Sequence, residues 1–168
     1  MKRIISLVIM LAITLSMLVG CCTDKKENEK FMIYASIYPL YDFASKIGGD
    51  KAEVNLIIPT GIEPHDWEPT AKDIVNLSSA DLFIYNGAHL EHWVEDVEGT
   101  LKNENVTILC ATDNVAKLKN NGEDDPHVWL DPISAIIELE AIKDAFVECD
   151  SKNADYYTEN LHYYTHAI

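Results

Sequence analysis

Short apolar runs that alternate with helix-like segments are the feature that most restricts the fold of this chain. Four of the runs have the length of buried strands, and most are followed by proline, glycine or polar residues. We predict strands at residues 31–37, 52–58, 81–85 and 106–110, and helices between them at 39–47, 70–79 and 90–100. Because strands joined by crossover helices run parallel, this order predicts an α/β fold: a parallel-sheet lobe with helices on both faces.

The first twenty residues have the pattern of a secretory signal and are not expected to belong to the fold. A positive start is followed by a mostly apolar run that is short for a bilayer span. The run ends in Leu-Val-Gly-Cys at residues 18–21, which matches a bacterial lipobox and predicts lipidation of Cys21. An ordinary signal peptide or a short membrane anchor is the alternative. Residues 21–30 are the predicted flexible tether, since positions 23–30 carry no apolar side chain. The expected location is the extracytoplasmic side of the cell membrane, lipid-anchored.

The strong acidity of the chain restricts its partners. Its formal net charge is −15, and removal of residues 1–20, which carry two cations, takes this to −17. Such a charge argues against binding to nucleic acid or to an anionic membrane surface and mildly favours cations. Two cysteines remain beyond the tether, Cys110 and Cys149. An extracytoplasmic setting permits a disulfide between them, but their spacing does not require one.

Two helices are predicted after the last strand. The first opens at Asp131 and carries one apolar stripe, formed by Ala135, Leu139, Ile142, Phe146 and Cys149. Its spacing predicts that Cys149 is a buried thiol on the core face. The second begins near Asn153 and reaches Ile168 without a C-cap glycine or a basic last turn. We therefore expect that the sequence is cut short within this helix.

Two histidines lie in loops rich in proline and acidic residues, and they are the candidate metal ligands. His65 lies within Glu-Pro-His-Asp-Trp-Glu-Pro at residues 63–69, and His127 within Asp-Asp-Pro-His-Val-Trp-Leu-Asp-Pro at residues 124–132. A preceding proline restricts the backbone of each ligand, and imidazole suits zinc and neighbouring transition metals. Nearby carboxylates can orient the second ring nitrogen or act as ligands themselves. The candidates for that supporting role are Glu63, Asp66, Glu68, Asp125 and Asp131.

Four linked motifs make the sequence similar to the zinc- and manganese-binding solute-binding lipoproteins of ABC importers. They are Ile-Ile-Pro-Thr-Gly-Ile-Glu-Pro-His-Asp-Trp-Glu-Pro-Thr at 57–70, Ala-Asp-Leu-Phe-Ile-Tyr-Asn-Gly at 80–87, Leu-Glu-His-Trp at 90–93, and the segment at 125–132. The resemblance implies two α/β lobes joined by one long helix, with the metal ion between the lobes. Residues 31–150 then form the N-terminal metal-binding lobe, and residues 151–168 begin the inter-lobe helix.

The resemblance also implies a ligand set, a cargo and a membrane partner. His65 and His127 correspond to the two histidines of the N-terminal lobe, and the remaining two ligands belong to a C-terminal lobe beyond Ile168. Zinc is favoured, because residues 63–69 and 90–93 resemble the zinc branch; manganese is the alternative. A histidine-rich stretch precedes the second ligand in many zinc members, whereas residues 120–125 here are polar and acidic. The implied function is capture of a divalent metal ion and its delivery to an ABC permease.

Two other functions are possible, and four further histidines have expected roles outside the candidate site. A zinc hydrolase would use His65, His127 and a carboxylate as ligands and Glu68 as the base, but no His-Glu-x-x-His motif supports it. An adhesin-like surface lipoprotein is compatible with metal binding. The expectation is therefore a non-enzymatic protein. We predict structural or surface roles for His89 and His92, and a solvated helix face for His162 and His166.

Overall fold

The computed structural model describes residues 30–120 and 122–166, and the predicted signal, the tether up to residue 29 and Cys21 lie outside them. The strands are β1 Phe31–Ala35, β2 Ala52–Leu56, β3 Leu82–Tyr85, β4 Thr107–Cys110, β5 Lys119–Asn120 and β6 Glu123–Asp124. The α-helices are α2 Tyr38–Gly48, α3 Ala71–Ser78, α4 Val94–Asn103, α5 Pro132–Cys149 and α6 Ala154–Thr165. Short 3₁₀ turns are η1 Gly49–Lys51, η2 Pro64–Asp66, η3 Val128–Leu130 and η4 Ser151–Asn153.

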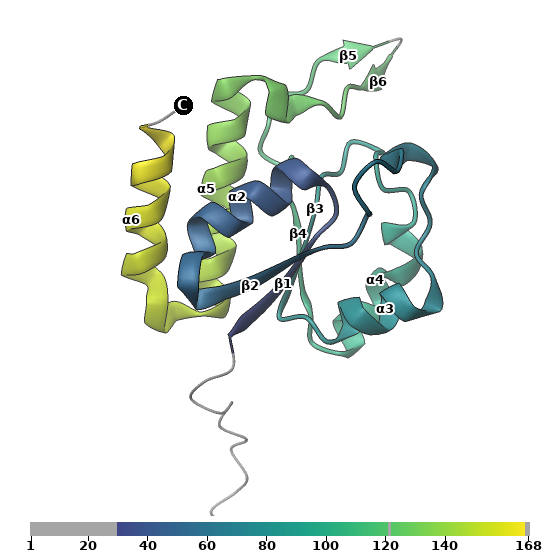
Figure 1. Cartoon of the computed structure of the whole chain (residues 1–168). Helices are drawn as coiled ribbons and strands as arrows, with labels where there is room; N and C mark the ends of the chain where they lie inside the picture. The colour runs from purple at the N-terminus through teal and green to yellow at the C-terminus, as the bar shows by residue number, and fades with distance from the viewer. Residues whose placement is uncertain (1–29, 121, 167–168) are drawn as a thin grey trace, which may run out of the picture.

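Four strands form a parallel sheet in the order β2-β1-β3-β4. Helices α2, α5 and α6 lie on one side of the sheet, and α3 and α4 lie on the other (Figure 1). This arrangement confirms the predicted α/β lobe with helices on both faces. It also brings the carboxyl ends of the strands to one edge, which is where open parallel sheets place their ligands.

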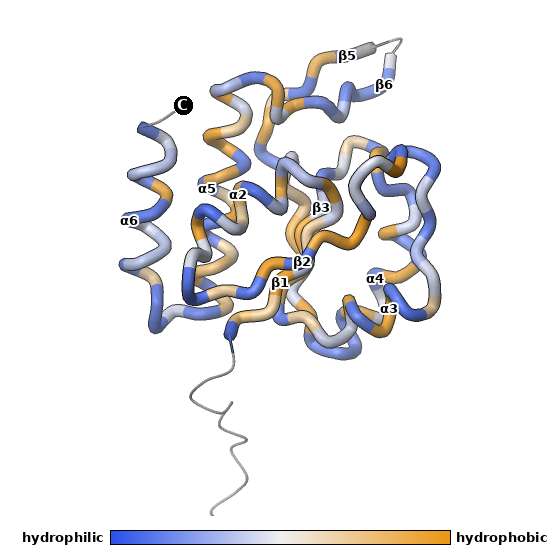
Figure 2. The backbone as a smooth tube through the Cα atoms, viewed as in Figure 1, coloured by the Kyte–Doolittle hydropathy of each residue, from blue (hydrophilic) through white to orange (hydrophobic). Residues whose placement is uncertain are grey.

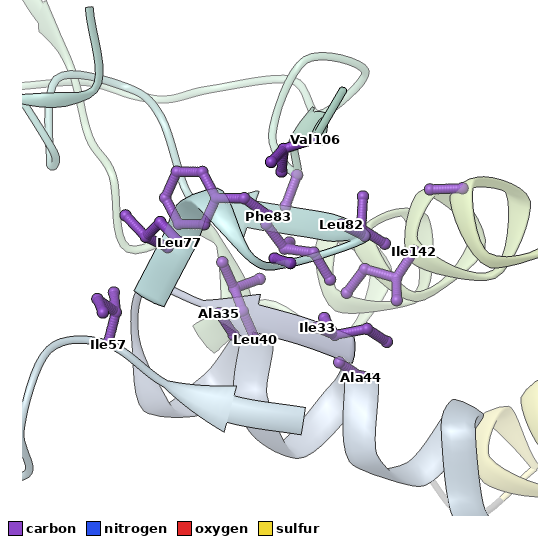
Figure 3. Packing of buried hydrophobic residues seen from close by; sticks show 14 of the residues in the cluster. Ile33, Ala35, Leu40, Ala44, Ile57, Leu77, Leu82, Phe83, Val106 and Ile142 are labelled. Atoms are coloured by element: carbon purple, nitrogen blue, oxygen red, sulfur yellow. The ribbon is translucent and has the colours of Figure 1, made fainter. Parts of the chain in front are cut away.

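The core fills both faces of the sheet with aliphatic and aromatic side chains (Figure 3). In the register of β1 and β3, Ile33 is paired with Leu82, so both side chains point to the same face, towards α2 and Ile142 of α5. Phe83 points to the opposite face, towards Leu77 of α3. Each such side chain is fully buried and stabilises the fold by about 1.5–3 kcal/mol. The hydropathy of the chain follows this layout, with the most apolar segments in the central strands (Figure 2).

The starts of α3 and α5 are capped by side-chain hydrogen bonds. The Thr70 hydroxyl accepts from the backbone N–H of Asp73, and the Asp73 carboxylate accepts in return from the N–H of Thr70 at 2.8 Å. Asp131 caps α5 by accepting from the N–H of Ser134 at 2.9 Å, and Pro132 occupies the first turn.

The sequence prediction was wrong at the start of one helix. The helix expected at residues 90–100 begins only at Val94 and ends at Asn103. Residues 86–93 form a loop instead, in which the side chain of Glu91 turns inward and accepts from the backbone N–H groups of Asn86 and Gly87, each at 2.9 Å. These bonds hold a tight loop, so the segment does not continue the helix.

A hairpin that was not predicted lies within the acidic segment before His127. Strands β5 and β6 pair antiparallel, with Gly122 at a positive φ of 94° beside the turn. Figure 1 shows the hairpin projecting beyond the helices, near the amino-terminal end of α5.

Helix α6 packs against α2 and α5 and is tied to the rest of the lobe by polar contacts. Tyr157 is fully buried, and its hydroxyl donates to Asp150 at 2.5 Å. The Tyr164 hydroxyl donates to Asp42 at 2.9 Å, and the Asn160 side chain donates to the Ile47 carbonyl at 2.9 Å. The division into a lobe ending at residue 150 and an inter-lobe helix stays a prediction.

The apolar stripe predicted for α5 is confirmed at four positions, because Ala135, Leu139, Ile142 and Phe146 are buried. Cys149 is only half-buried, although it packs against the core. In the described part of the chain, no disulfide joins it to Cys110. Over the same residues, none of the helices has both the length and the apolar character that a membrane crossing requires.

Candidate metal site

His65 lies in the long loop that follows β2, on the short turn η2. Glu63 caps this turn, its carboxylate accepting from the backbone N–H of His65 at 3.4 Å, and Pro64 occupies the first position. Proline and the cap together restrict the backbone that carries the imidazole. Nearby, Trp67 packs edge-on against Trp93, with ring centroids 5.3 Å apart, and anchors the loop to the core. The imidazole itself remains exposed.

His127 lies between β6 and α5 and is oriented by Asp125. The Asp125 carboxylate accepts from the backbone N–H of His127 at 3.0 Å and contacts Nδ1 of its ring at 2.8 Å. These two hydrogen bonds, the backbone one first, lower the pKa of Asp125. Since an ionised carboxylate can only accept, Nδ1 carries the proton and the lone pair of Nε2 is left for a metal ion.

The two imidazoles face each other across a short gap. Their ring centroids are 6.2 Å apart and their planes are inclined by 56°. A zinc–nitrogen bond of about 2.1 Å plus a ring radius of roughly 1.1 Å limits two imidazoles on one zinc to centroids about 6.4 Å apart. The observed separation is within this limit, and a shift of about 1 Å would bring the rings to the roughly 5 Å expected for tetrahedral geometry.

Both histidines line one open pocket of about 330 Å³ at the carboxyl edge of the sheet. His89 and His92 line the same pocket, together with the acidic residues Glu123, Asp124 and Asp125. Both His89 and His92 are exposed, and the structural or surface roles expected of them stay a prediction. Their shared pocket with His65 and His127 was not predicted. The relevant signal was the presence of two further histidines directly after a strand that ends at this edge.

A buried asparagine, Asn86, links the loop after β3 to the loop that carries His127. Asn86 is fully buried at the end of β3, and its side-chain amide donates to the Pro126 carbonyl at 3.0 Å. That carbonyl belongs to the residue directly before His127. The loop after β3 and the loop of the second candidate ligand are thereby held together by one amide.

The carboxylates predicted to support the histidines have different roles. Asp125 contacts the ring of His127, and Glu63 caps the turn that carries His65. The carboxylate of Asp131 caps α5 through Ser134, whose hydrogen bonds lower the pKa of Asp131. Asp66 and Glu68 are exposed and do not line the pocket.

The two predicted metal ligands, His65 and His127, lie close together in the described part of the chain. Within residues 30–120 and 122–166, no group of three or more histidine, cysteine or carboxylate side chains is already arranged to hold a metal. His162 and His166 lie on the exposed face of α6 with ring centroids 4.1 Å apart, and neither lines the pocket. The arrangement can therefore supply half of a tetrahedral shell.

Comparison with known proteins gives consistent results in sequence and in structure. The high-affinity zinc uptake system protein ZnuA of Bacillus subtilis (strain 168) is 35% identical in an alignment 149 residues long, which covers 80% of this chain and 47% of that protein. The manganese ABC transporter substrate-binding lipoprotein PsaA of Streptococcus pneumoniae is 32% identical, covering 100% of this chain and 58% of that protein. The crystal structure of Zn(II)-bound AdcA from Streptococcus pneumoniae superposes with a TM-score of 0.78 at 34% identity, covering 83% of this chain and 30% of that one.

The chain thus spans about half the length, or less, of several proteins that it resembles. The model of the family described as the periplasmic zinc-uptake complex component A matches residues 33–168, which is most of the sequence. This match shows that the chain belongs to the zinc-uptake complex component A family.

Proposed function

We propose that this chain captures a divalent transition metal ion, with zinc favoured, outside the membrane and passes it to an ABC permease. The observation that carries the proposal is that His65 and His127 line one pocket with their ring centroids 6.2 Å apart. Relatives of the same family are named for zinc uptake or for manganese transport. Capture without chemistry fits a pocket in which Glu68, the base of the hydrolase alternative, takes no part.

Zinc is favoured over manganese by the donor atoms that the pocket offers. Two imidazoles are borderline-soft donors suited to zinc, whereas manganese prefers sites dominated by carboxylate, carbonyl and water oxygens. The partner residues of the ion beyond these two histidines belong to the predicted C-terminal lobe, or are water molecules in its absence. Zinc bound by this chain alone is therefore open to solvent and weakly held.

Location and delivery form the second part of the proposal. A lipid anchor at Cys21 would keep the lobe on the extracytoplasmic side of the cell membrane, with residues 21–30 as the tether between the anchor and the lobe. An adhesin-like surface role is the alternative, and it is favoured by no contact in the described structure.

The proposal is tested by zinc titration of the purified chain in a calorimeter at pH 7.5. His65→Ala and His127→Ala should each lower the affinity of their shared ion at least tenfold, because each removes one of two protein ligands, and tenfold corresponds to about 1.4 kcal/mol. Affinity should also fall as pH falls, since imidazoles must be neutral to ligate.

The matched control removes the histidine pair of α6. His162→Ala combined with His166→Ala should leave the titration of the His65 and His127 ion unchanged. Loss of that ion in the α6 variant, with His65 and His127 dispensable, would show that the assigned site is wrong.

A further inference from the structure

The loop at residues 86–93, between β3 and α4, holds two histidines in an unusual backbone conformation. Three successive residues have positive φ: Gly87 at 84°, Ala88 at 50° and His89 at 63°. Positive φ is uncommon for residues with a side chain and concentrates at functional sites.

Buried anchors on the loop direct its two histidines outward. The Glu91 carboxylate is only 5% exposed and accepts from the backbone of Asn86 and Gly87 and from the Ser36 hydroxyl, the last at 2.5 Å. Leu90 and Trp93 are buried as well. His89 and His92, which flank the anchors Leu90 and Glu91, are exposed. Three buried residues of the loop therefore hold two imidazoles at the surface.

The two imidazoles are close enough to share one ion after a shift of about 1 Å. Their ring centroids are 6.3 Å apart, close to the 6.2 Å between His65 and His127 and within the same limit of about 6.4 Å for a shared zinc. Both side chains line the 330 Å³ pocket. A loop held from beneath by Glu91 keeps this spacing without a metal, so less freedom is lost when an ion binds.

Carboxylates of the β5–β6 hairpin line the same pocket and offer oxygen ligands. Glu123 is exposed, and Asp124 forms an ion pair with Lys119 at 2.6 Å. The pKa of Asp124 is lowered, first by the hydrogen bond from Lys119, and His89 is among the weaker contributors. The hairpin and the histidine loop both contribute to the lining of this pocket.

We propose that His89 and His92 form a second site for a divalent transition metal ion, beside the His65 and His127 site, with a hairpin carboxylate as third ligand. Since no three such side chains among the described residues already surround one point, the carboxylate moves in with the ion. The proposal does not depend on zinc binding by His65 and His127.

Zinc stoichiometry tests the proposal on the purified full chain. Cys21→Ser and Cys22→Ser are present in every variant, so that these two thiols bind no zinc. Equilibrium dialysis at pH 7.5 with excess zinc should give two ions per chain. His89→Ala combined with His92→Ala should remove one ion, and His65→Ala combined with His127→Ala should remove the other. In the His65→Ala, His127→Ala variant labelled with ¹⁵N-histidine, nuclear magnetic resonance should show that zinc shifts the imidazole ¹⁵N signals of His89 and His92.

Three outcomes would overturn the second site. A single bound ion in the parent chain would do so, whether it is lost in one double variant or in both. Unchanged imidazole signals of His89 and His92 at saturating zinc would do so as well. A second ion lost only in the control variant, His162→Ala with His166→Ala, would place it on α6. Circular dichroism of each variant confirms that the lobe remains folded.

Discussion

At the scale of single residues, the pairing of Asp125 with His127 does most to define the candidate site. The residue types and their spacing predicted that a neighbouring carboxylate would support the ring, and Asp125 was one of five candidates. The structure selects it, because its carboxylate contacts both the backbone N–H and Nδ1 of His127. Such contacts fix the tautomer and the direction of the free nitrogen.

Replacing Asp125 by asparagine should weaken zinc binding at the His65 and His127 site. An amide neither raises the basicity of the imidazole nor requires Nδ1 to be the donor, and loss of such partners costs about 10–100-fold in metal affinity. Because the pKa of Asp125 is lowered, its carboxylate stays ionised below the usual range, so the effect should persist at mildly acidic pH. Zinc titration of Asp125→Asn at pH 7.5 and pH 6 measures it.

Asp131 supplies the matched control, because it caps α5 and has no contact with a histidine ring in the described structure. Asp131→Ala should lower the free energy of unfolding by about 1 kcal/mol. Its zinc affinity should remain that of the parent chain. Equal affinity losses in Asp125→Asn and Asp131→Ala would mean that orientation of His127 is not what the carboxylate contributes.

At the scale of elements, α5 contains a buried acidic residue that its amphipathic pattern does not explain. Glu138 is fully buried, and neither of its carboxylate oxygens has a hydrogen-bond partner among the described residues. Desolvation raises its pKa from 4.5 to about 8. The folded chain therefore keeps Glu138 protonated at neutral pH, whereas the unfolded chain releases the proton near pH 4.5.

This shift makes α5 a source of pH-dependent instability. Between pH 4.5 and pH 8 the folded state binds the extra proton, so the free energy of unfolding falls as pH rises, by up to about 1.4 kcal/mol per pH unit. Glu138→Leu should remove this dependence and raise stability at pH 7 by about 3 kcal/mol or less. Urea unfolding at pH 5, 6, 7 and 8 measures the slope.

Glu140 is the control on the same helix, since it is exposed. Glu140→Gln should leave the pH profile of unfolding unchanged. Glu138→Gln separates the two parts of the effect, because it abolishes titration but leaves a buried polar group. A parent chain whose stability is flat between pH 5 and pH 8 would contradict the raised pKa.

At the scale of the whole molecule, the predicted lipid anchor at Cys21 would determine where the lobe works. Expressed in bacteria with its own leader, the chain should fractionate with membranes and incorporate labelled fatty acid. Cys21→Ser should abolish the labelling, because the cysteine thiol is the site of acylation in the predicted lipobox. Cys22→Ser should not. Labelling that survives Cys21→Ser would contradict the lipobox at residues 18–21.

The sequence by itself determined the α/β class and the sheet strands within a few residues. It also identified His65 and His127 as candidate metal ligands. Local patterns decide these features: strand-length apolar runs, helix caps such as Thr70 with Asp73, and proline before each histidine. The Asn-Gly pair at residues 121–122 is a hairpin signal of the same local kind, although the hairpin was not predicted.

Only the tertiary structure decided how the four pocket histidines meet. His65 follows β2 and His89 follows β3, and the parallel order β2-β1-β3-β4 brings the ends of those strands to one edge, whereas His127 follows the separate β5–β6 hairpin. The loop before α4 depends in the same way on a distant residue. Glu91 forms a loop rather than a helical turn because its carboxylate reaches Ser36, which lies 55 positions away in the chain. A sequence pattern records local preference, whereas contacts of this range exist only after the sheet has formed.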